Sequence, residues 1–261
     1  MRPSTLSLST LLASALAAPM QGSSCTRESL QAAANAYIAA QTAGSGPFSL
    51  IGAATVYTEN FEKTAIASGM LSKALKIDHS RSSLDTTQCA TYTELIITAT
   101  AHPYVLGTQL WLAPDGTVAK METLISDQGD WLFNAANTLK YATQESWAVI
   151  PEGERDSRAV LQAAADAYCD IFNDKSVKVP WGTPCARLEG GSYTGRGAPT
   201  DSCDVGIPNG VKNTNRRYVI DETVGAVDVF MTFAERLPDS HEFRVEKGKL
   251  RFVHTITIMD P

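Results

Sequence analysis

The sequence predicts an α+β protein of two tandem cone-shaped domains, each a helix packed on a curved antiparallel sheet. The chain repeats itself: residues 30–37 recur as residues 161–168, 131 residues later, with seven of eight positions identical. Two further pairs keep nearly this spacing, Glu59 with Glu189 at 130 and residues 115–118 with residues 247–250 at 132. A period of this length suits whole domains rather than a solenoid.

Each copy begins with an amphipathic helical pattern, continues through a stretch broken by Gly and Pro, and ends in β-rich sequence. The first helix follows Thr26, a common N-cap residue, and has Glu28 in its first turn. We expect helices over residues 26–43 and 156–173 and, in the second copy, strands over residues 217–220, 226–233, 241–246 and 249–259.

The segment between the copies contains Trp131, Tyr141 and Trp147. It is too aromatic for a free linker, so we expect it to pack across the seam between the domains. The expected organisation is a signal peptide over residues 1–17, a first domain over 25–129, a connector over 130–155 and a second domain over 156–261.

Residues 1–17 have the pattern of an export signal. Arg2 precedes a short apolar stretch and a small-x-small site at residues 15–17. That stretch is too short to span a bilayer, so we expect a protein that is secreted or lies in a secretory lumen, with no membrane span. The chain has 261 residues, 44% of them hydrophobic, and 28 acidic against 22 basic residues give a net charge of −6. This acidic balance argues against a nucleic-acid partner.

The five cysteines fit an oxidising compartment, where an even subset should pair. Cys185 and Cys203 bracket a loop rich in Gly, Pro and Ser and form the first expected disulfide. Cys25 with Cys89 is the next pair. Cys169 then remains alone on a helix, where we expect a buried, inert thiol.

The last strand predicts an apolar inner wall. Leu250, Phe252, His254, Ile256 and Ile258 alternate onto one face. If Lys247–Gly248 is a two-residue turn, His241 faces His254 and Phe243 faces Phe252. A one-residue slip would break this pairing. We therefore expect two adjacent imidazoles in an apolar cavity, with both phenylalanines contacting a substrate.

The first copy has Glu122 where the second has His254. Its partner is Gln109 for a two-residue turn and Thr108 for a bulged one. A carboxylate on an inward face should have a raised pKa, which suits a general acid or base. Glu189 lies in a segment held by the expected Cys185 disulfide and is a further catalytic candidate. Tyr193 and Trp181 are expected as walls of the substrate site.

Several chemistries lack their motifs. The sequence contains no Gly-x-Ser-x-Gly elbow, no phosphate-binding Gly-x-x-x-x-Gly-Lys-Ser/Thr loop and no His-Glu-x-x-His. Two facing histidines would have no third zinc ligand at a recognisable spacing. We therefore expect no cofactor and no metal.

Residues 130–135, 147–151 and 238–255 resemble a family of exported fungal proteins catalogued as a domain of unknown function. The resemblance covers nearly the whole mature chain and implies a fungal protein of the secretory route, often associated with secondary metabolism. It supplies no catalytic residues. By architecture alone, the chain is also similar to tandem SnoaL-like, ketosteroid-isomerase-like domains. Relatives of that type that open epoxides and close polyether rings use an inward carboxylate pair in each domain.

These observations lead to two hypotheses. The first is a cofactor-independent enzyme that acts on a hydrophobic polyketide- or terpenoid-like molecule by epoxide opening, cyclisation, dehydration or isomerisation. In it His254 is the general acid or base, and His241 or Glu189 orients it or delivers the opposing proton. The alternative is a secreted non-catalytic protein, either a small-molecule carrier or a structural module.

Overall fold

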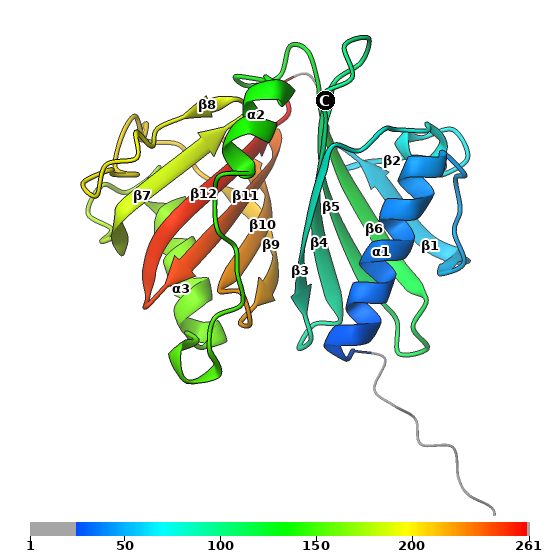
Figure 1. Cartoon of the computed structure of the whole chain (residues 1–261), viewed down its shortest axis with the longest axis horizontal. Coiled ribbons are helices and arrows are strands. Elements are labelled where there is room, and N and C mark those ends of the chain that lie inside the picture. The colour runs from blue at the N-terminus through cyan, green and yellow to red at the C-terminus, as the bar shows by residue number, and fades with distance from the viewer. Residues whose placement is uncertain (1–24, 260–261) are drawn as a thin grey trace, which may run out of the picture.

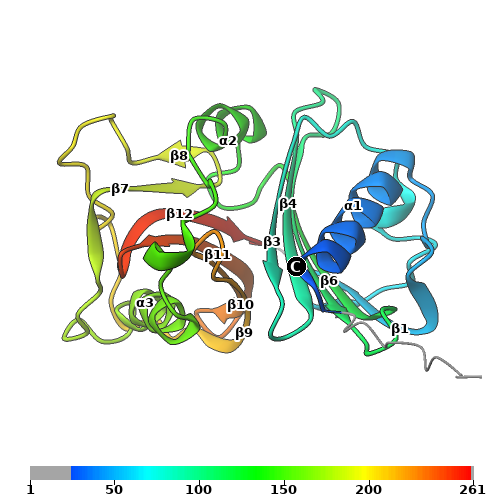
Figure 2. The ribbon, with the colours of Figure 1, turned by 60° about the horizontal axis from the view of Figure 1, so that its bottom comes forward.

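Two six-stranded sheets stand face to face in the computed structural model, which describes residues 25–259. Each sheet curves around a long helix on the side away from the other sheet (Figures 1 and 2). The predicted fold class, two tandem α+β domains, is confirmed. Each sheet therefore has a helix-side face, packed on its own helix, and an inter-sheet face, packed toward the other domain.

The same order of elements occurs twice. The first domain contains α1 (Arg27–Ala43), β1 (Ile51–Glu59), β2 (Glu62–Lys63), η1 (Met70–Ser72), β3 (His79–Asp85), β4 (Ala90–Ile97), β5 (Tyr104–Leu112) and β6 (Val118–Ser126). A connecting segment with α2 (Ala135–Ala142) and η2 (Glu152–Glu154) follows. The second domain contains α3 (Arg158–Asp170), β7 (Trp181–Glu189), β8 (Ser192–Tyr193), β9 (Thr214–Asp221), β10 (Ala226–Phe233), β11 (Leu237–Glu246) and β12 (Lys249–Thr257).

The strand orders are β2-β1-β6-β5-β4-β3 and β8-β7-β12-β11-β10-β9. Within each sheet the long strands pair antiparallel except at one place, where β1 runs parallel to β6 and β7 runs parallel to β12. The sheets are thus mixed rather than purely antiparallel. This arrangement follows from the chain entering each sheet at β1 or β7, next to the last strand of the same domain.

The repeated octapeptide forms the buried stripe of each helix. Leu30, Ala33, Ala34 and Tyr37 are buried at i, i+3, i+4 and i+7, and their counterparts in α3 are buried in the same way. The Thr26 cap is confirmed, since its side chain accepts a hydrogen bond from the Ser29 amide at 3.1 Å. The duplication in the sequence is therefore a duplication of core packing.

The β11–β12 hairpin contains the most consequential departure from the predicted register. Glu246 pairs with Lys249 and Val245 with Leu250, as a two-residue turn requires, but Arg244 then pairs with Phe252. Arg251 is the extra residue of a β-bulge, and beyond it every pair is shifted by one. The shift moves the following β12 residues to the opposite face from the one expected.

The two domains meet through a pseudo-symmetric set of charges at the end of β3 and β9. Arg158 donates to both carboxylate oxygens of Asp85 at 2.8 Å, and Arg27 donates to Asp221 at 2.7 Å. Each aspartate also accepts a backbone N–H from the opposite domain at 2.9 Å, from residue 220 and residue 84 respectively. Both aspartates are buried, so the sheets are joined by paired charges rather than by apolar packing alone.

Two disulfides are present, Cys25–Cys89 and Cys185–Cys203, which confirms both predicted pairs. Cys169 is buried without a disulfide, and burial raises the pKa of its thiol, as expected for an inert cysteine. Disulfides are typical of secreted or extracellular proteins. The expected signal peptide, residues 1–17, lies outside the described residues. Within residues 25–259, no helix is both long and apolar enough for a membrane span.

Candidate functional site

His241 lies on the helix-side face of β11, next to a carboxylate. Its Nδ1 is 2.5 Å from Oδ1 of Asp239, two residues earlier on the same face. The exposed fractions are 3% for His241 and 0% for Asp239. The second oxygen of Asp239 accepts a hydrogen bond from Thr257 Oγ1 at 2.5 Å. The carboxylate therefore fixes the orientation of the imidazole, and Nε2 is the ring nitrogen left for a ligand.

Aromatic rings surround this imidazole. The ring centroids of Tyr168 in α3 and of Phe172, just after the end of α3, lie 5.4 and 6.3 Å from that of His241, and the Phe243 ring lies 6.0 Å away. Trp181 packs on Tyr168 at 5.7 Å. Phe243 and Trp181, two of the predicted substrate-binding residues, thus belong to the core of the second domain that supports His241.

A cavity of about 410 Å³ opens beside His241, between the helix-side face of the second sheet and the end of α3. We call it the cone pocket. Its lining includes Phe172, Arg187, Glu189, His241, Thr255 and Trp131 of the connector. His241 and Glu189, both catalytic candidates from the sequence, lie at this one cavity.

The negative charge of Glu189 is balanced by an arginine inside the cone pocket. Its carboxylate contacts the Arg187 guanidinium and accepts a long hydrogen bond, 3.4 Å, from Trp131 Nε1. Arg187 also donates to the backbone carbonyl of Cys203 at 3.2 Å, which ties the ion pair to the disulfide loop. This arrangement gives Glu189 a role in shaping the polar wall of the pocket, beside the histidine rather than hydrogen-bonded to it.

Three buried polar atoms near this pocket have no hydrogen-bond partner among residues 25–259. They are the Tyr168 hydroxyl, Thr255 Oγ1 and Arg187 Nε. Thr255 and Arg187 line the cavity. Burial raises the pKa of Tyr168, so its phenol stays protonated. Buried polar groups are normally satisfied, and unsatisfied ones beside a cavity are available to a bound molecule.

The first domain has a threonine, Thr108, where the second has His241. Thr108 occupies the strand position of His241, and its hydroxyl lies 2.8 Å from Tyr37 Oη and 3.0 Å from Thr123 Oγ1. Met70 and Leu71 of η1 are buried in the same core. Here the polar groups satisfy one another beside this apolar core, so the two copies differ at the position where the second carries histidine.

The predicted juxtaposition of His241 with His254 is wrong. Because of the bulge at Arg251, His254 pairs with Glu242 and His241 pairs with Thr255. The two imidazoles point to opposite faces of the second sheet. His254 lies on the inter-sheet face, with Nδ1 2.9 Å from Glu94 and Nε2 2.7 Å from Glu145.

Both nitrogens of His254 are engaged by carboxylates. Although burial opposes its charge, Glu94 and Glu145 raise the pKa of His254 to about 10. An imidazolium with both N–H groups bonded has no lone pair to accept a proton at neutral pH.

Arg81 lies in the same cluster of charges. Its guanidinium is 2.8 Å from Glu242 and 3.6 Å above the Trp147 ring. Trp147 thereby contacts both domains, since it also stacks on Phe252.

Glu122 also lies on the inter-sheet face rather than in a cone. It pairs with Gln109, the first of the two predicted partners. Its carboxylate accepts from Arg217 Nε at 3.0 Å and from Lys120 Nζ at 2.7 Å. Glu122 therefore occupies an inter-domain ion cluster, as His254 does at the same position in the second copy.

Tyr193 and Phe252 also lie away from the cone pocket. Both line a second cavity, on the other side of the second sheet. Asp239, Tyr168 and Thr255 are site residues that sequence analysis missed. The Asp-x-His spacing of residues 239 and 241, which puts both side chains on one strand face, was the available signal.

Residues 154–257 match the family model described as Domain of unknown function (DUF8021). The matched segment contains the sheet and helix that form the cone pocket. A search of curated proteins finds no match. Among residues 25–259, no three His, Cys, Asp or Glu side chains are arranged to hold a metal ion.

Proposed function

We propose that the second domain binds a hydrophobic small molecule in the cone pocket and that His241, oriented by Asp239, transfers a proton to or from it. The observation that carries this proposal is the buried His241–Asp239 pair at the wall of a cavity. Histidine is the commonest general acid or base, and a carboxylate on its second nitrogen fixes its tautomer and stabilises its charged form.

The size and lining of the pocket support this class of ligand. A volume of about 410 Å³ falls within the usual range for small-molecule sites, which are mostly apolar with a few polar groups. Phe172, Phe233 and Leu237 supply apolar surface, and Thr255 and Arg187 supply hydrogen-bonding groups. A substrate atom at Nε2 of His241 would thus be held among rings, close to donors that can stabilise developing negative charge.

Reactions that need only placed acids and bases fit this site: epoxide opening, cyclisation, dehydration or isomerisation. In each, Nε2 takes a proton from one position and the imidazolium returns it to another. The resemblance to ketosteroid-isomerase-like domains and the association with fungal secondary metabolism, both expected from the sequence, agree with such chemistry. Both are part of this proposal, and so is secretion through the predicted signal peptide.

The test uses three apolar probe compounds: an epoxide, a β-hydroxy ketone and a β,γ-unsaturated ketone. Conversion is followed by mass spectrometry and ultraviolet absorbance, and binding by ligand-observed NMR. We expect turnover of at least one probe, a loss of about 10²–10⁴-fold in His241→Gln, and a smaller loss in Asp239→Asn.

The matched control is His102→Gln, because His102 lies exposed in a loop of the first domain. It should leave the rate unchanged. Unaltered turnover in a folded His241→Gln variant would contradict the catalytic role. Binding of all three probes without conversion would favour the alternative, a secreted carrier.

A further inference from the structure

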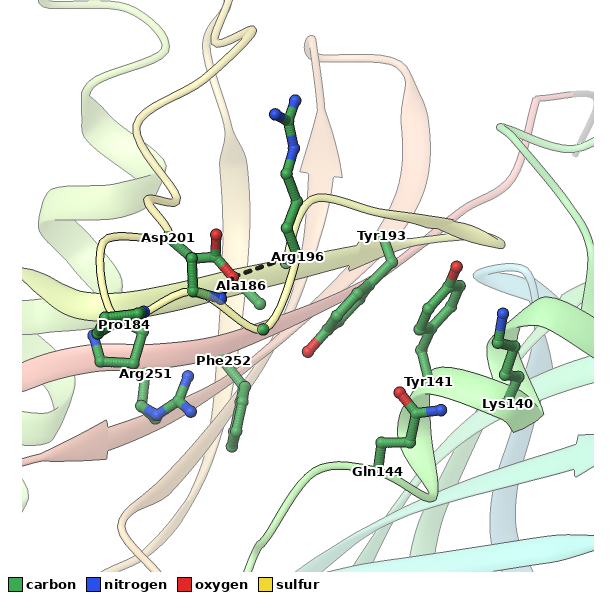
Figure 3. Close-up of a pocket in the computed structure, with 14 residues that line it drawn as sticks. Lys140, Tyr141, Gln144, Pro184, Ala186, Tyr193, Arg196, Asp201, Arg251 and Phe252 are labelled. Atoms are coloured by element: carbon green, nitrogen blue, oxygen red, sulfur yellow. Dashed lines mark hydrogen bonds between the residues drawn. The ribbon is translucent and has the colours of Figure 1, made fainter.

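A second cavity lies on the inter-sheet face of the second sheet, beneath the connector. We call it the seam pocket; its volume is about 700 Å³. Lys140, Tyr141 and Gln144 come from α2 and the residues after it, Tyr193 from β8, and Arg251 and Phe252 from β12 (Figure 3). The sheet separates this cavity from the cone pocket, so the two can be perturbed independently.

The seam pocket carries an excess of positive charge on an acidic protein. Lys140, Arg196 and Arg251 line it with a single carboxylate, Asp201. That carboxylate is already used by the loop, because it accepts the backbone amides of Arg196 at 2.6 Å and Ala198 at 3.1 Å. Seven other described arginines form salt bridges, Arg27, Arg81, Arg158, Arg187, Arg216, Arg217 and Arg244. None of the described carboxylates forms a salt bridge with the three seam-pocket cations.

The β-bulge in β12 places the central cation. Arg251 is the residue without a cross-strand partner, and it lines the same cavity as its neighbour Phe252 although adjacent strand residues normally point to opposite faces. Its guanidinium carbon lies 4.1 Å from the centre of the Phe252 ring. The bulge thus delivers a half-buried, unpaired guanidinium to an aromatic wall.

The other wall is also aromatic. Tyr141 and Tyr193 stack with centroids 4.4 Å apart and an interplanar angle of 12°. Figure 3 shows the Tyr193 ring directed across the pocket toward Phe252, with Arg251 beside them. The cavity therefore has aromatic side chains on two sides, and the Arg251 guanidinium lies over the ring of one of them, Phe252.

We propose that the seam pocket is a separate binding site for a planar aromatic carboxylate. The guanidinium of Arg251 presents a fork of N–H donors that matches a carboxylate, and the Tyr193 ring, in the same cavity as Phe252, receives the aromatic part of the ligand. Lys140 adds positive charge at the rim. This assignment does not depend on the chemistry proposed for His241.

The test compares two probes of nearly equal shape, 2-naphthoate and its neutral analogue 2-naphthamide, by isothermal titration calorimetry. We expect the wild-type chain to bind the carboxylate about tenfold or more tightly than the amide, with the preference declining as salt is added. Arg251→Gln should abolish the preference. Arg251→Lys should retain part of it, because the charge remains and the fork is lost.

Two further variants separate the sites. Lys140→Gln changes an exposed side chain on α2 and should reduce the preference without disturbing the fold. His241→Gln, in the cone pocket, should leave naphthoate binding unchanged. Equal affinity for the two probes, or an undiminished preference in both Arg251→Gln and Lys140→Gln, would overturn the proposal. A loss confined to His241→Gln would move the ligand to the cone pocket.

Discussion

Replacing His254 with Gln should destabilise the protein strongly, because the imidazolium balances two buried carboxylates. Glu94 and Glu145 lie 2.9 and 2.7 Å from its two nitrogens, and all three side chains are almost fully inaccessible. A glutamine amide can donate to one carboxylate and carries no charge. Removing one partner of a buried ion pair costs about 3–5 kcal/mol, so we expect a loss of this order in the free energy of unfolding.

The loss should depend on pH with a defined sign. The folded pKa of His254 is about 10 against 6.5 for an ordinary histidine. The stability that the charged His254 gives to the folded protein is therefore fully present below pH 6.5. It is lost as the pH rises toward 10, at up to about 1.4 kcal/mol per pH unit. The charges of His254 and Arg81 outweigh burial and lower the pKa of Glu94 from 4.5 to about 2. That contribution is present above pH 4.5 and is lost as the pH falls toward 2.

The difference between wild type and His254→Gln should thus be largest between about pH 4.5 and 6.5. Urea unfolding of the oxidised protein, followed by circular dichroism at pH 5.5, 7, 8 and 9, measures it. His102→Gln is the matched control, with the same chemical change at an exposed site. If the His254→Gln difference stays constant from pH 6.5 to 9, the imidazole is not charged in the folded protein and the electrostatic account is wrong.

Two further predictions concern the covalent and ionic links between distant segments. Replacing both cysteines of the Cys25–Cys89 pair by Ser should lower the free energy of unfolding by about 4 kcal/mol, and the same change at Cys185–Cys203 by about 3 kcal/mol. The first disulfide has the larger effect because it closes the longer loop, 64 against 18 residues. Urea unfolding measures both losses, and the reverse order would contradict the loop-entropy argument. In the same assay, Arg158→Ala should lower the free energy of unfolding more than Arg27→Ala does. The Arg158 side chain donates two hydrogen bonds to Asp85 and is 21% exposed, whereas the Arg27 side chain donates one to Asp221 and is 33% exposed. An equal loss would show that the second hydrogen bond adds nothing.

The local architecture was predictable because its signals are local. The octapeptide that begins each copy carries the helical spacing of buried residues, and Thr26 marks where α1 begins. In the second copy the strands around the 221–225 turn were predicted within a few residues of β9 and β10. The disulfides followed from loop composition and compartment.

The site was harder to predict because of one residue. Neither Arg251 nor its neighbours Leu250 and Phe252 is a Gly, Pro or Asn that would mark a bulge, so the sequence predicts an unbroken alternation along β12. That single insertion reversed the faces of the residues that follow and separated His241 from His254. The first copy has a bulge in the same strand position, at Ala119, where a longer turn compensates and leaves Glu122 opposite Gln109 as predicted.

The apolar-inside rule also failed for a physical reason. Every residue of β4 is buried, and nearly every residue of β11 and β12, because one face packs on a helix and the other on the second sheet. When both faces are covered, apolar content does not say which one lines the cone. Phe252, His254 and Ile256 form an apolar-looking face, yet they meet the first domain and the connector.

The two copies agree at the inter-domain face and differ in the cones. Glu122 and His254 share one strand position, and each contacts an arginine of the opposite domain, Arg217 or Arg81. In the cones, the first copy carries Thr108, satisfied by two neighbouring hydroxyls, and the second carries His241 beside a cavity. Ionic contacts between the domains thus occur in both copies, although the residue at this strand position differs. His241 has no such counterpart, and this asymmetry supports placing the proposed proton transfer in the second cone.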